Sequence, residues 1–393
     1  MPTPDRVPVL VLGAGPAGLA TSAMLAHHGI EHTVLERGPR VAWSWVNFYD
    51  SLVLHTGKHL SALPLAGFPP GTPLFPPRAA FVDYLEHYAT SRVLPVRTGL
   101  DVTRVARDGY GWIVHADGEE IRAHALVMAT GIAANPYMPP MAGRERYGGR
   151  LMHSVQYRRP DGMAGERILV VGAGNSGAEI ASELARHGAT VTIAVRSGVN
   201  VVPRALAGVP IQYVALALRR LPRSVQRRVA AVVGAIGARR HGAMLPRAAH
   251  GPLDAIPIIG FHLVDAVREG VVTVRPGVTE FTESGARFAD GTSGAFDTVI
   301  MATGFTPALS ALGGLVSRDE HGFARRTDRV TSADQPGLFF VGQNYDALGG
   351  LRNLAMDARL VGDRLARVKH QIRTLVSGSW KAQTPASKRE RGW

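Results

Sequence analysis

The 393-residue sequence contains no cysteine. A chain without thiols has no disulfides and no thiolate metal ligands. It also has no cysteine nucleophile, and every dithiol redox mechanism is excluded. No cluster of histidines and carboxylates with metal-ligand spacing replaces the missing thiolates, so we expect no metal site.

Long apolar runs are also absent. The longest candidate, residues 229–238, is about half the 18–20 residues that a membrane span requires. Residues 7–12 are apolar but lead directly into a glycine motif, so we interpret them as a first strand rather than a signal peptide. We therefore expect a cytoplasmic protein, and its length predicts two or three domains.

Acidic residues are absent from residues 196–250, which contain ten arginines and supply most of the net charge of +13. The chain has only four lysines, so we attribute the arginine excess to codon usage and expect no nucleic-acid partner. Within this segment, two helices separated by Pro222 are predicted as a basic insertion, residues 213–245. Its apolar face is expected to pack on the neighbouring domain. A membrane-surface helix, a dock for an acidic partner and a homodimer stay open.

The most informative feature that is present is an internal repeat. Residues 9–18 (VLVLGAGPAG) recur as residues 168–177 (ILVVGAGNSG). Each copy is an apolar strand, a Gly-x-Gly-x-x-Gly turn and a helical pattern, followed by a second strand at 32–35 or 190–195. These are the opening units of two Rossmann-type dinucleotide-binding folds.

The residue that ends each second strand differs in charge between the two copies. Glu36 follows the first, where a carboxylate would accept hydrogen bonds from ribose hydroxyls. Arg196 and Ser197 follow the second, where a guanidinium suits a 2′-phosphate. We therefore expect FAD at the first site and NADPH at the second.

A further repeat predicts how the domains connect. Residues 126–131 (LVMATG) resemble residues 299–304 (VIMATG) and mark the passages between domains. Residues 101–108 and 111–117 alternate like a small β-meander, and Asp290-Gly291 predicts a hairpin turn. We expect an α/β protein whose second Rossmann domain is inserted into the first. The predicted boundaries are 1–158 with 300–375 for FAD, 159–299 for NADPH, and a disordered basic tail at 376–393.

One segment carries a family resemblance. Residues 147–157 (YGGRLMHSVQY) resemble the F-x-G-x-x-x-H-x-x-x-(F/Y) motif of the class B flavin-dependent monooxygenases, which include the flavin-containing monooxygenases and the plant YUCCA enzymes. Tyr147 stands where the family has Phe. Baeyer–Villiger relatives carry Trp at the last position, so Tyr157 favours the other branch. Flavin-dependent disulfide reductases are excluded by the missing cysteines.

Two more segments extend the resemblance to residues 7–370. Residues 44–58 (SWVNFYDSLVLHTGK) resemble the flavin-contacting segment of YUCCA-type and bacterial members, with His55 as in YUCCA enzymes but Gly57 in place of their Pro. Residues 337–343 and 356–358 resemble the closing FAD strand and helix.

The resemblance implies an NADPH- and O2-dependent monooxygenase. NADPH would reduce the flavin, O2 would form a C4a-(hydro)peroxyflavin, and that adduct would oxygenate a small organic molecule at nitrogen or sulfur, or oxidise a 2-oxo acid. His55 and Thr56 are the expected catalytic residues beside the flavin, and His153 is expected to be structural. The expected cofactor contacts are Gly13, Gly15, Pro16, Ala17, Gly18, Glu36, Arg37, Trp45, His55, Gly131, Gly172, Gly174, Asn175, Ser176, Gly177, Arg196, Ser197, Gly304, Gly342 and Gln343.

Two alternatives remain at this stage. One is a Baeyer–Villiger or decarboxylating oxygenase that acts on a carbonyl compound. The other is a flavin- and nucleotide-binding redox sensor or partner protein without oxygenase turnover. Neither requires a Ser-His-Asp triad or a carboxylate pair, and the sequence contains no such constellation.

Overall fold

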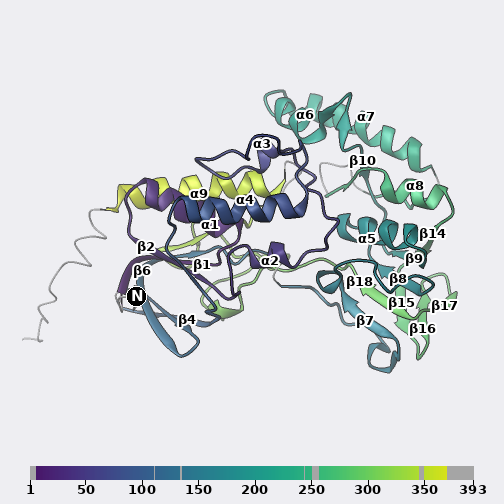
Figure 1. Cartoon of the computed structure of the whole chain (residues 1–393), viewed down its shortest axis with the longest axis horizontal. Coiled ribbons are helices and arrows are strands. Elements are labelled where there is room, and N and C mark those ends of the chain that lie inside the picture. The colour runs from purple at the N-terminus through teal and green to yellow at the C-terminus, as the bar shows by residue number, and fades with distance from the viewer. Residues whose placement is uncertain are drawn as a thin grey trace, which may run out of the picture.

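The computed structural model describes residues 6–109, 111–132, 135–242, 244–249, 256–344 and 349–369. The expected tail at 376–393 lies outside them. Figure 1 shows two lobes along the long axis, each built on a parallel sheet with helices against it. None of the described helices is long and apolar enough to cross a membrane.

The first lobe contains a parallel sheet centred on β1 (Arg6–Leu12). Residues 7–12 of this strand are all buried, as expected for a strand that is covered on both faces. The strand order is β3-β2-β1-β6, and β19 pairs with the end of β6. These partners are β2 (His32–Glu36), β3 (Val96–Thr98), β6 (Glu119–Met128) and β19 (Leu338–Phe340).

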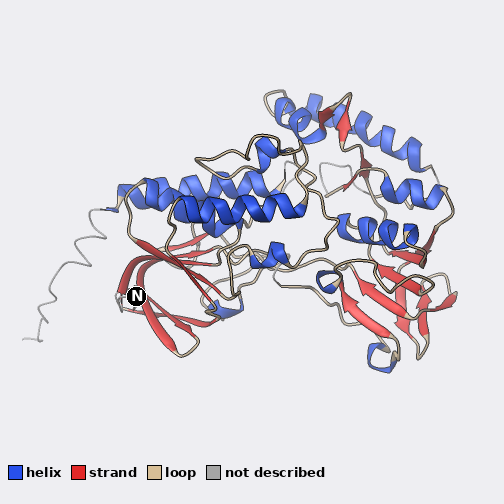
Figure 2. Ribbon diagram, in the orientation of Figure 1, coloured by secondary structure: helices blue, strands red, loops and turns tan. Residues whose placement is uncertain are grey.

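Three helices cover one face of this sheet (Figure 2). They are α1 (Pro16–His27), α4 (Arg78–Ser91) and α9 (Gly350–Arg367), and α1 packs along α9. The meander that the sequence predicts is present as β4 (Val102–Asp108) and β5 (Gly111–Ala116), which pair antiparallel with each other. β5 also pairs antiparallel with the start of β6. Two short helices, α2 (Trp43–Val46) and α3 (Lys58–Ser61), lie in the loops between β2 and α4.

The second lobe repeats the strand arrangement of the first. Its parallel sheet has the order β14-β9-β8-β18-β7, with a central strand β8 that leads into the second glycine turn. The strands are β7 (Arg150–His153), β8 (Arg167–Val171), β9 (Thr190–Val195), β14 (Val272–Pro276) and β18 (Thr298–Met301). Together with α5 (Asn175–Arg186) and α8 (His262–Arg268) they confirm the prediction of two Rossmann-type folds.

Smaller elements complete this lobe. An antiparallel sheet contains the predicted hairpin at Asp290-Gly291 between its second and third strands. The strands are β15 (Val278–Phe281), β16 (Gly285–Phe288) and β17 (Ser293–Ala295). Short 3-10 turns lie nearby at η1 (Arg144–Arg146) and η2 (Ser154–Gln156), and a further one, η3 (Ser310–Leu312), packs on β4 of the first lobe.

The sheet pairing corrects one expected boundary. We expected residues up to 158 in the first domain, but β7 pairs with β18 from Arg150↔Thr298 to Met301↔His153. Parallel pairing with a strand 148 residues further along the chain leaves no local trace in the sequence, so the pattern could not reveal it.

The basic insertion forms two helices, α6 (Ile211–Leu218) and α7 (Arg223–His241), with Pro222 before α7 as predicted. They follow β10 (Val201–Val202), β11 (Ala205–Leu206) and β12 (Val209–Pro210), and β13 (Ile258–Ile259) pairs with β10. Only one stripe of α7, including Val233 and Gly237, is buried against the domain. Val225, Val232 and Ile236 are 36–61% exposed, so the expected packing of the apolar face is only partly present.

Candidate active site and nucleotide sites

The first glycine turn has the sterics of a dinucleotide cradle. Gly13 has φ +101°, and an added Cβ would lie 2.6 Å from the Ala129 carbonyl oxygen. A Cβ on Gly18 would overlap the Gly13 carbonyl oxygen, so these two glycines are required by the turn itself. Gly15 has no atom within 4 Å of a built Cβ, which leaves the approach to the α1 N-terminus open to a pyrophosphate.

The second turn has the same arrangement. Gly172 has φ +104° and faces the Ala302 carbonyl oxygen, Gly177 lies against the Gly172 carbonyl, and Gly174 is open. The Asn175 side chain binds the backbone on either side of Ile258 in β13: its Nδ2 donates to the Pro257 oxygen at 3.1 Å, and its Oδ1 accepts from Ile259 N at 2.9 Å. This side chain therefore holds β13 against α5, a structural contact beside the cofactor role expected for it.

Glu36 closes the first turn from the end of β2. Its Oε2 accepts a hydrogen bond from Ala14 N at 2.7 Å, and its Oε1 accepts one from Gly38 N at 2.9 Å. A carboxylate offers about four acceptor positions, so two remain for ribose hydroxyls. The donor and acceptor set at this turn fits a dinucleotide.

Arg196 and Ser197 are exposed directly after β9. Within the described chain, Arg196 makes no ion pair or hydrogen bond, so its guanidinium is available to a phosphate. Arg196 and Ser197 follow β9 in the second lobe at the place where Glu36 ends β2 in the first, as the sequence predicts. Their assignment to NADPH stays a prediction.

His153 contacts Gly304, the last residue of the second Ala-Thr-Gly segment. Its Nε2 lies 3.0 Å from the Gly304 carbonyl oxygen, and its Nδ1 accepts a hydrogen bond from Val155 N. Because burial lowers the pKa of His153, the ring is neutral and binds the backbone. Gly131 and Gly304 both have positive φ, and a built Cβ meets nothing at either. These contacts agree with the structural role expected of His153.

His55 lies where the two lobes meet and is held by a carboxylate that the sequence did not identify. His55 Nε2 is 2.5 Å from Glu179 Oε1, and the Tyr49 hydroxyl donates to Glu179 Oε2 at 2.5 Å. Glu179 lies on α5, in the second lobe, whereas His55 and Tyr49 belong to the loop after α2 in the first. The signal was a carboxylate in the second turn of a helix that buries its other side, but its partner is 124 residues away.

The electrostatics of this contact fix the proton on His55. Burial raises the pKa of Glu179, but the hydrogen bond and charge of His55 and the Tyr49 hydroxyl lower it more, so the net pKa is below the ordinary value. Burial and the same carboxylate raise the pKa of Tyr49 well above its usual range. An ionised Glu179 can only accept, so we assign a proton to His55 Nε2. His55 Nδ1 is then the ring nitrogen left for a ligand.

Thr56 and Trp45 are placed mainly by packing. Thr56 is buried, bonds Ser61 at 2.5 Å between hydroxyl oxygens, and lies against Gly349 at the start of α9. The Trp45 ring meets Phe81 edge-to-face with centroids 4.5 Å apart. Flavin contacts for both remain predictions.

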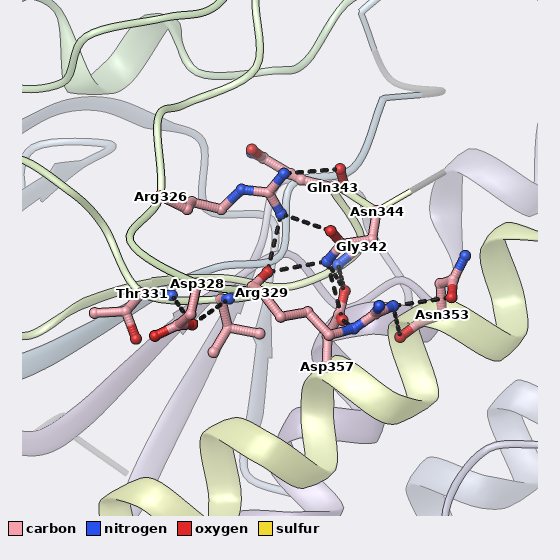
Figure 3. Close-up of polar contacts among 10 residues, drawn as sticks. Arg326, Asp328, Arg329, Thr331, Gly342, Gln343, Asn344, Asn353 and Asp357 are labelled. Carbon is pink, nitrogen blue, oxygen red and sulfur yellow. Dashed lines mark hydrogen bonds and ion pairs between the residues drawn. The ribbon is translucent and has the colours of Figure 1, made fainter. Parts of the chain in front are cut away.

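A polar network ties residues 342–344, which follow β19, to α9, as Figure 3 shows. Asp357 is fully buried and accepts from Arg329 Nε at 2.5 Å, Asn344 Nδ2 at 2.9 Å and Gly342 N at 3.2 Å. Next to this network, Gln343 Oε1 is buried and has no hydrogen-bond partner in the described chain. A buried acceptor of this kind fits a polar group of a bound flavin nucleotide.

A cleft of about 360 Å³ opens between the first lobe and the linkers that lead to the second. It brings Arg37, which we expected to contact FAD, together with the end of the 147–157 motif. The residues that line it are Arg37, Trp43, Ser44, Asn47, Pro136, Val155, Gln156 and Arg158.

Comparison with known proteins gives matches along most of the chain. A family model described as pyridine nucleotide-disulphide oxidoreductase matches residues 10–205. The chain is 35% identical over 364 residues to indole-3-pyruvate monooxygenase YUCCA1 of Oryza sativa subsp. japonica, covering 88% of this chain and 89% of that protein. It is also 35% identical to the probable indole-3-pyruvate monooxygenase YUCCA1 of Arabidopsis thaliana, with 75% of each chain covered.

Among solved structures, the flavin-containing monooxygenase from Stenotrophomonas maltophilia is similar over nearly its whole length. The TM-score is 0.73 at 27% identity, and the match covers 93% of this chain and 100% of that one. The disulfide chemistry in the name of the family model cannot proceed through a cysteine pair here, because the chain has no cysteine.

Proposed function

The chain belongs to the class B flavin-dependent monooxygenases, and on this premise we propose that it uses FAD and NADPH to oxidise a 2-oxo acid with loss of CO2. The enzyme is a flavoprotein oxygenase that binds a flavin and a pyridine nucleotide and acts with O2 on a small organic substrate. What we propose is the identity of the two nucleotides, FAD and NADPH, and the class of substrate. The observation that carries the substrate class is 35% identity over 88% of the chain to an enzyme named for indole-3-pyruvate, which is a 2-oxo acid.

The proposed reaction balances with one O2 and one NADPH. R–CO–COOH, O2, NADPH and H⁺ give R–COOH, CO2, H2O and NADP⁺. The bond between the keto carbon and the carboxyl carbon breaks, one oxygen atom enters the new acid and the other leaves as water. When bound, the flavin supplies the electron transfer from NADPH to O2.

The protein binds and orients the two nucleotides. The open positions at Gly15 and Gly174 admit the pyrophosphates to the N-termini of α1 and α5. Glu36 accepts from the ribose of the first nucleotide, and Arg196 pairs with the 2′-phosphate of the second, which favours NADPH over NADH.

His55 and Glu179 control a proton between the lobes. Glu179 holds Nε2–H of His55, so the imidazole has one orientation and presents Nδ1 to the reacting groups. The hydrogen bond crosses from one lobe to the other. We propose His55 as the catalytic residue and Thr56 as its neighbour at the flavin.

A product analysis tests the proposed function. The FAD-loaded protein is incubated with NADPH and ¹⁸O2 and offered phenylpyruvate, a tertiary amine and a sulfide in separate reactions. We expect phenylacetate with one ¹⁸O atom and one CO2 for each NADPH consumed. Oxygenated amine or sulfide without phenylacetate would replace the substrate class, and hydrogen peroxide as the sole product with every compound would favour the redox-sensor alternative.

A further inference from the structure

Arg204 is a cation placed between the two lobes by the second one. It follows β10, and its Nη2 lies 3.4 Å from the carbonyl oxygens of Val53 and Leu54, directly before His55. Its guanidinium carbon is 4.7 Å from the centre of the Phe75 ring. The side chain therefore reaches from the second lobe to the loop that carries the proposed catalytic histidine.

This cation has no anionic partner in the described chain. No carboxylate there lies within 4.0 Å of its guanidinium, and its buried Nε makes no hydrogen bond. The nearest acidic influence is Glu179, which already accepts from His55 and Tyr49. Burial lowers the pKa of Arg204, while the charge of Glu179 raises it. Arg204 is half-buried, and a paired anion stabilises a partly desolvated cation, so the arrangement suits a bound anion.

Two further buried polar groups near Arg204 also have no hydrogen-bond partners in the described chain. Gln212 is 1% exposed, and both its carboxamide nitrogen and its oxygen are without partners. Gln212 is the second residue of α6. It follows Ile211, whose N–H donates to the Arg204 carbonyl oxygen at 3.0 Å. His262 Nε2 is likewise buried without a partner, and its ring interacts electrostatically with Glu179, His55 and Arg204. Buried polar groups are normally satisfied, so several orphans in one region indicate a missing polar ligand.

We propose that Arg204, with Gln212 and His262, binds the carboxylate of the 2-oxo acid substrate. The inference rests on the proposed function and names the group that holds its substrate. A guanidinium matches the planar carboxylate with two parallel hydrogen bonds, and the Gln212 amide supplies further donors. The 2′-phosphate of NADPH is the competing anion, but Arg196 at the end of β9 stands at that position.

Equilibrium binding tests the site without turnover. The oxidised, FAD-loaded protein with NADP⁺ is titrated with phenylpyruvate and, separately, with its methyl ester, and calorimetry or the flavin absorbance reports the dissociation constant. We expect the wild type to prefer the acid. Arg204→Met should weaken binding of the acid by about ten- to hundred-fold, the range for loss of a charge-assisted hydrogen bond, and remove the preference over the ester.

Matched variants separate a ligand role from a structural one. Arg204→Lys keeps the charge and should restore part of the preference. Gln212→Met removes two unsatisfied buried atoms, so we expect equal or higher thermal stability together with weaker binding of the acid. Arg220→Met changes an exposed arginine of the same insertion and should leave both ligands unaffected.

Each contrary outcome has a distinct meaning. If Arg204→Met and Gln212→Met keep the full preference for the acid, the carboxylate site is wrong, and the proposed function stands as long as phenylpyruvate is converted. If Arg204→Met weakens NADP⁺ instead of the acid, Arg204 belongs to the nucleotide site. If the wild type neither binds nor oxidises any 2-oxo acid, the proposed function fails and this inference fails with it.

Discussion

At the scale of single residues, Glu179 decides the state of the proposed active site. It is partly buried, and its pKa is below the ordinary value because His55 and Tyr49 both stabilise its charge. Its two oxygens reach two residues of the other lobe at 2.5 Å each. One side chain therefore orients the histidine and joins the lobes.

Replacing Glu179 with Gln should destabilise the protein in a pH-dependent way. A carboxylate whose pKa is depressed by folding contributes stability that is fully present above its unfolded pKa of about 4.5. That contribution is lost as the pH falls through the lower, folded-state pKa. We expect Glu179→Gln to lower the free energy of unfolding by about 1–3 kcal/mol at pH 7, since one charged hydrogen-bond acceptor is replaced by a neutral one. Urea denaturation from pH 7 to pH 3.5 measures the difference.

The difference between wild type and Glu179→Gln should shrink below pH 4.5. Glu183→Gln is a matched control on the same helix, because the Glu183 carboxylate accepts from the Tyr157 hydroxyl at 2.9 Å and does not contact His55. It should leave the tautomer of His55 unchanged in ¹⁵N spectra of the FAD-free protein, whereas Glu179→Gln should shift it. A pH-independent difference, or an unchanged His55 spectrum in Glu179→Gln, would mean that Glu179 does not hold the proton on His55.

At the scale of elements, α6 explains why this chain has Gly57 where YUCCA enzymes have proline. The backbone at Gly57, φ −62° and ψ 150°, would accept proline or alanine. A Cβ there would lie 2.5 Å from the Tyr213 hydroxyl oxygen, and Tyr213 also binds His59 Nδ1 at 2.9 Å. The insertion therefore rests on the loop that carries His55, and glycine makes room for it.

Gly57→Ala should cost stability only because Tyr213 is present. Overpacking of this kind typically costs about 1–3 kcal/mol, so we expect a loss in that range in urea denaturation. Combining it with Tyr213→Ala should recover most of that loss in a double-mutant cycle. Gly67→Ala, in an exposed loop with nothing near a built Cβ, is the control. Additive effects of Gly57→Ala and Tyr213→Ala would show that α6 does not rest on this loop.

At the scale of the whole molecule, two similar lobes each contain the same kind of glycine turn. The glycines of the turns differ in function: Gly13 and Gly18 are required by the fold, while Gly15 faces open space. Folding and FAD binding can therefore be separated by choosing which glycine to change.

The purified protein should be yellow, with FAD that is released when acid denatures the chain, because there is no cysteine for a thioether link. FAD at 100 times its dissociation constant should stabilise the fold by about 2.7 kcal/mol. Gly15→Ala should keep the stability of the FAD-free protein and bind FAD weakly, whereas Gly18→Ala should destabilise even the FAD-free protein. Thermal melts with and without FAD measure both. A well-folded protein that FAD neither colours nor stabilises would contradict the assignment of the first site.

The sequence by itself determined the features that depend on neighbours along the chain. The strand–turn–helix units, the carboxylate and the arginine that end the second strands, the meander and the break at Pro222 all follow from steric rules within about 30 residues. The family motif at 147–157 favoured a flavin oxygenase, and the missing cysteines excluded a flavin-dependent disulfide reductase. The expected site residues of each nucleotide turn come together because they lie in one local unit.

Only the tertiary structure decided the contacts between the lobes. The bond between His55 and Glu179 spans 124 residues, and the fit of Gly57 under Tyr213 spans 156. Such pairs depend on how two packed lobes meet, and no periodicity or local propensity encodes that meeting. For the same reason Arg204 looked like one basic residue among ten, until the fold placed it next to His55 with backbone carbonyls but no carboxylate of the described chain as partners.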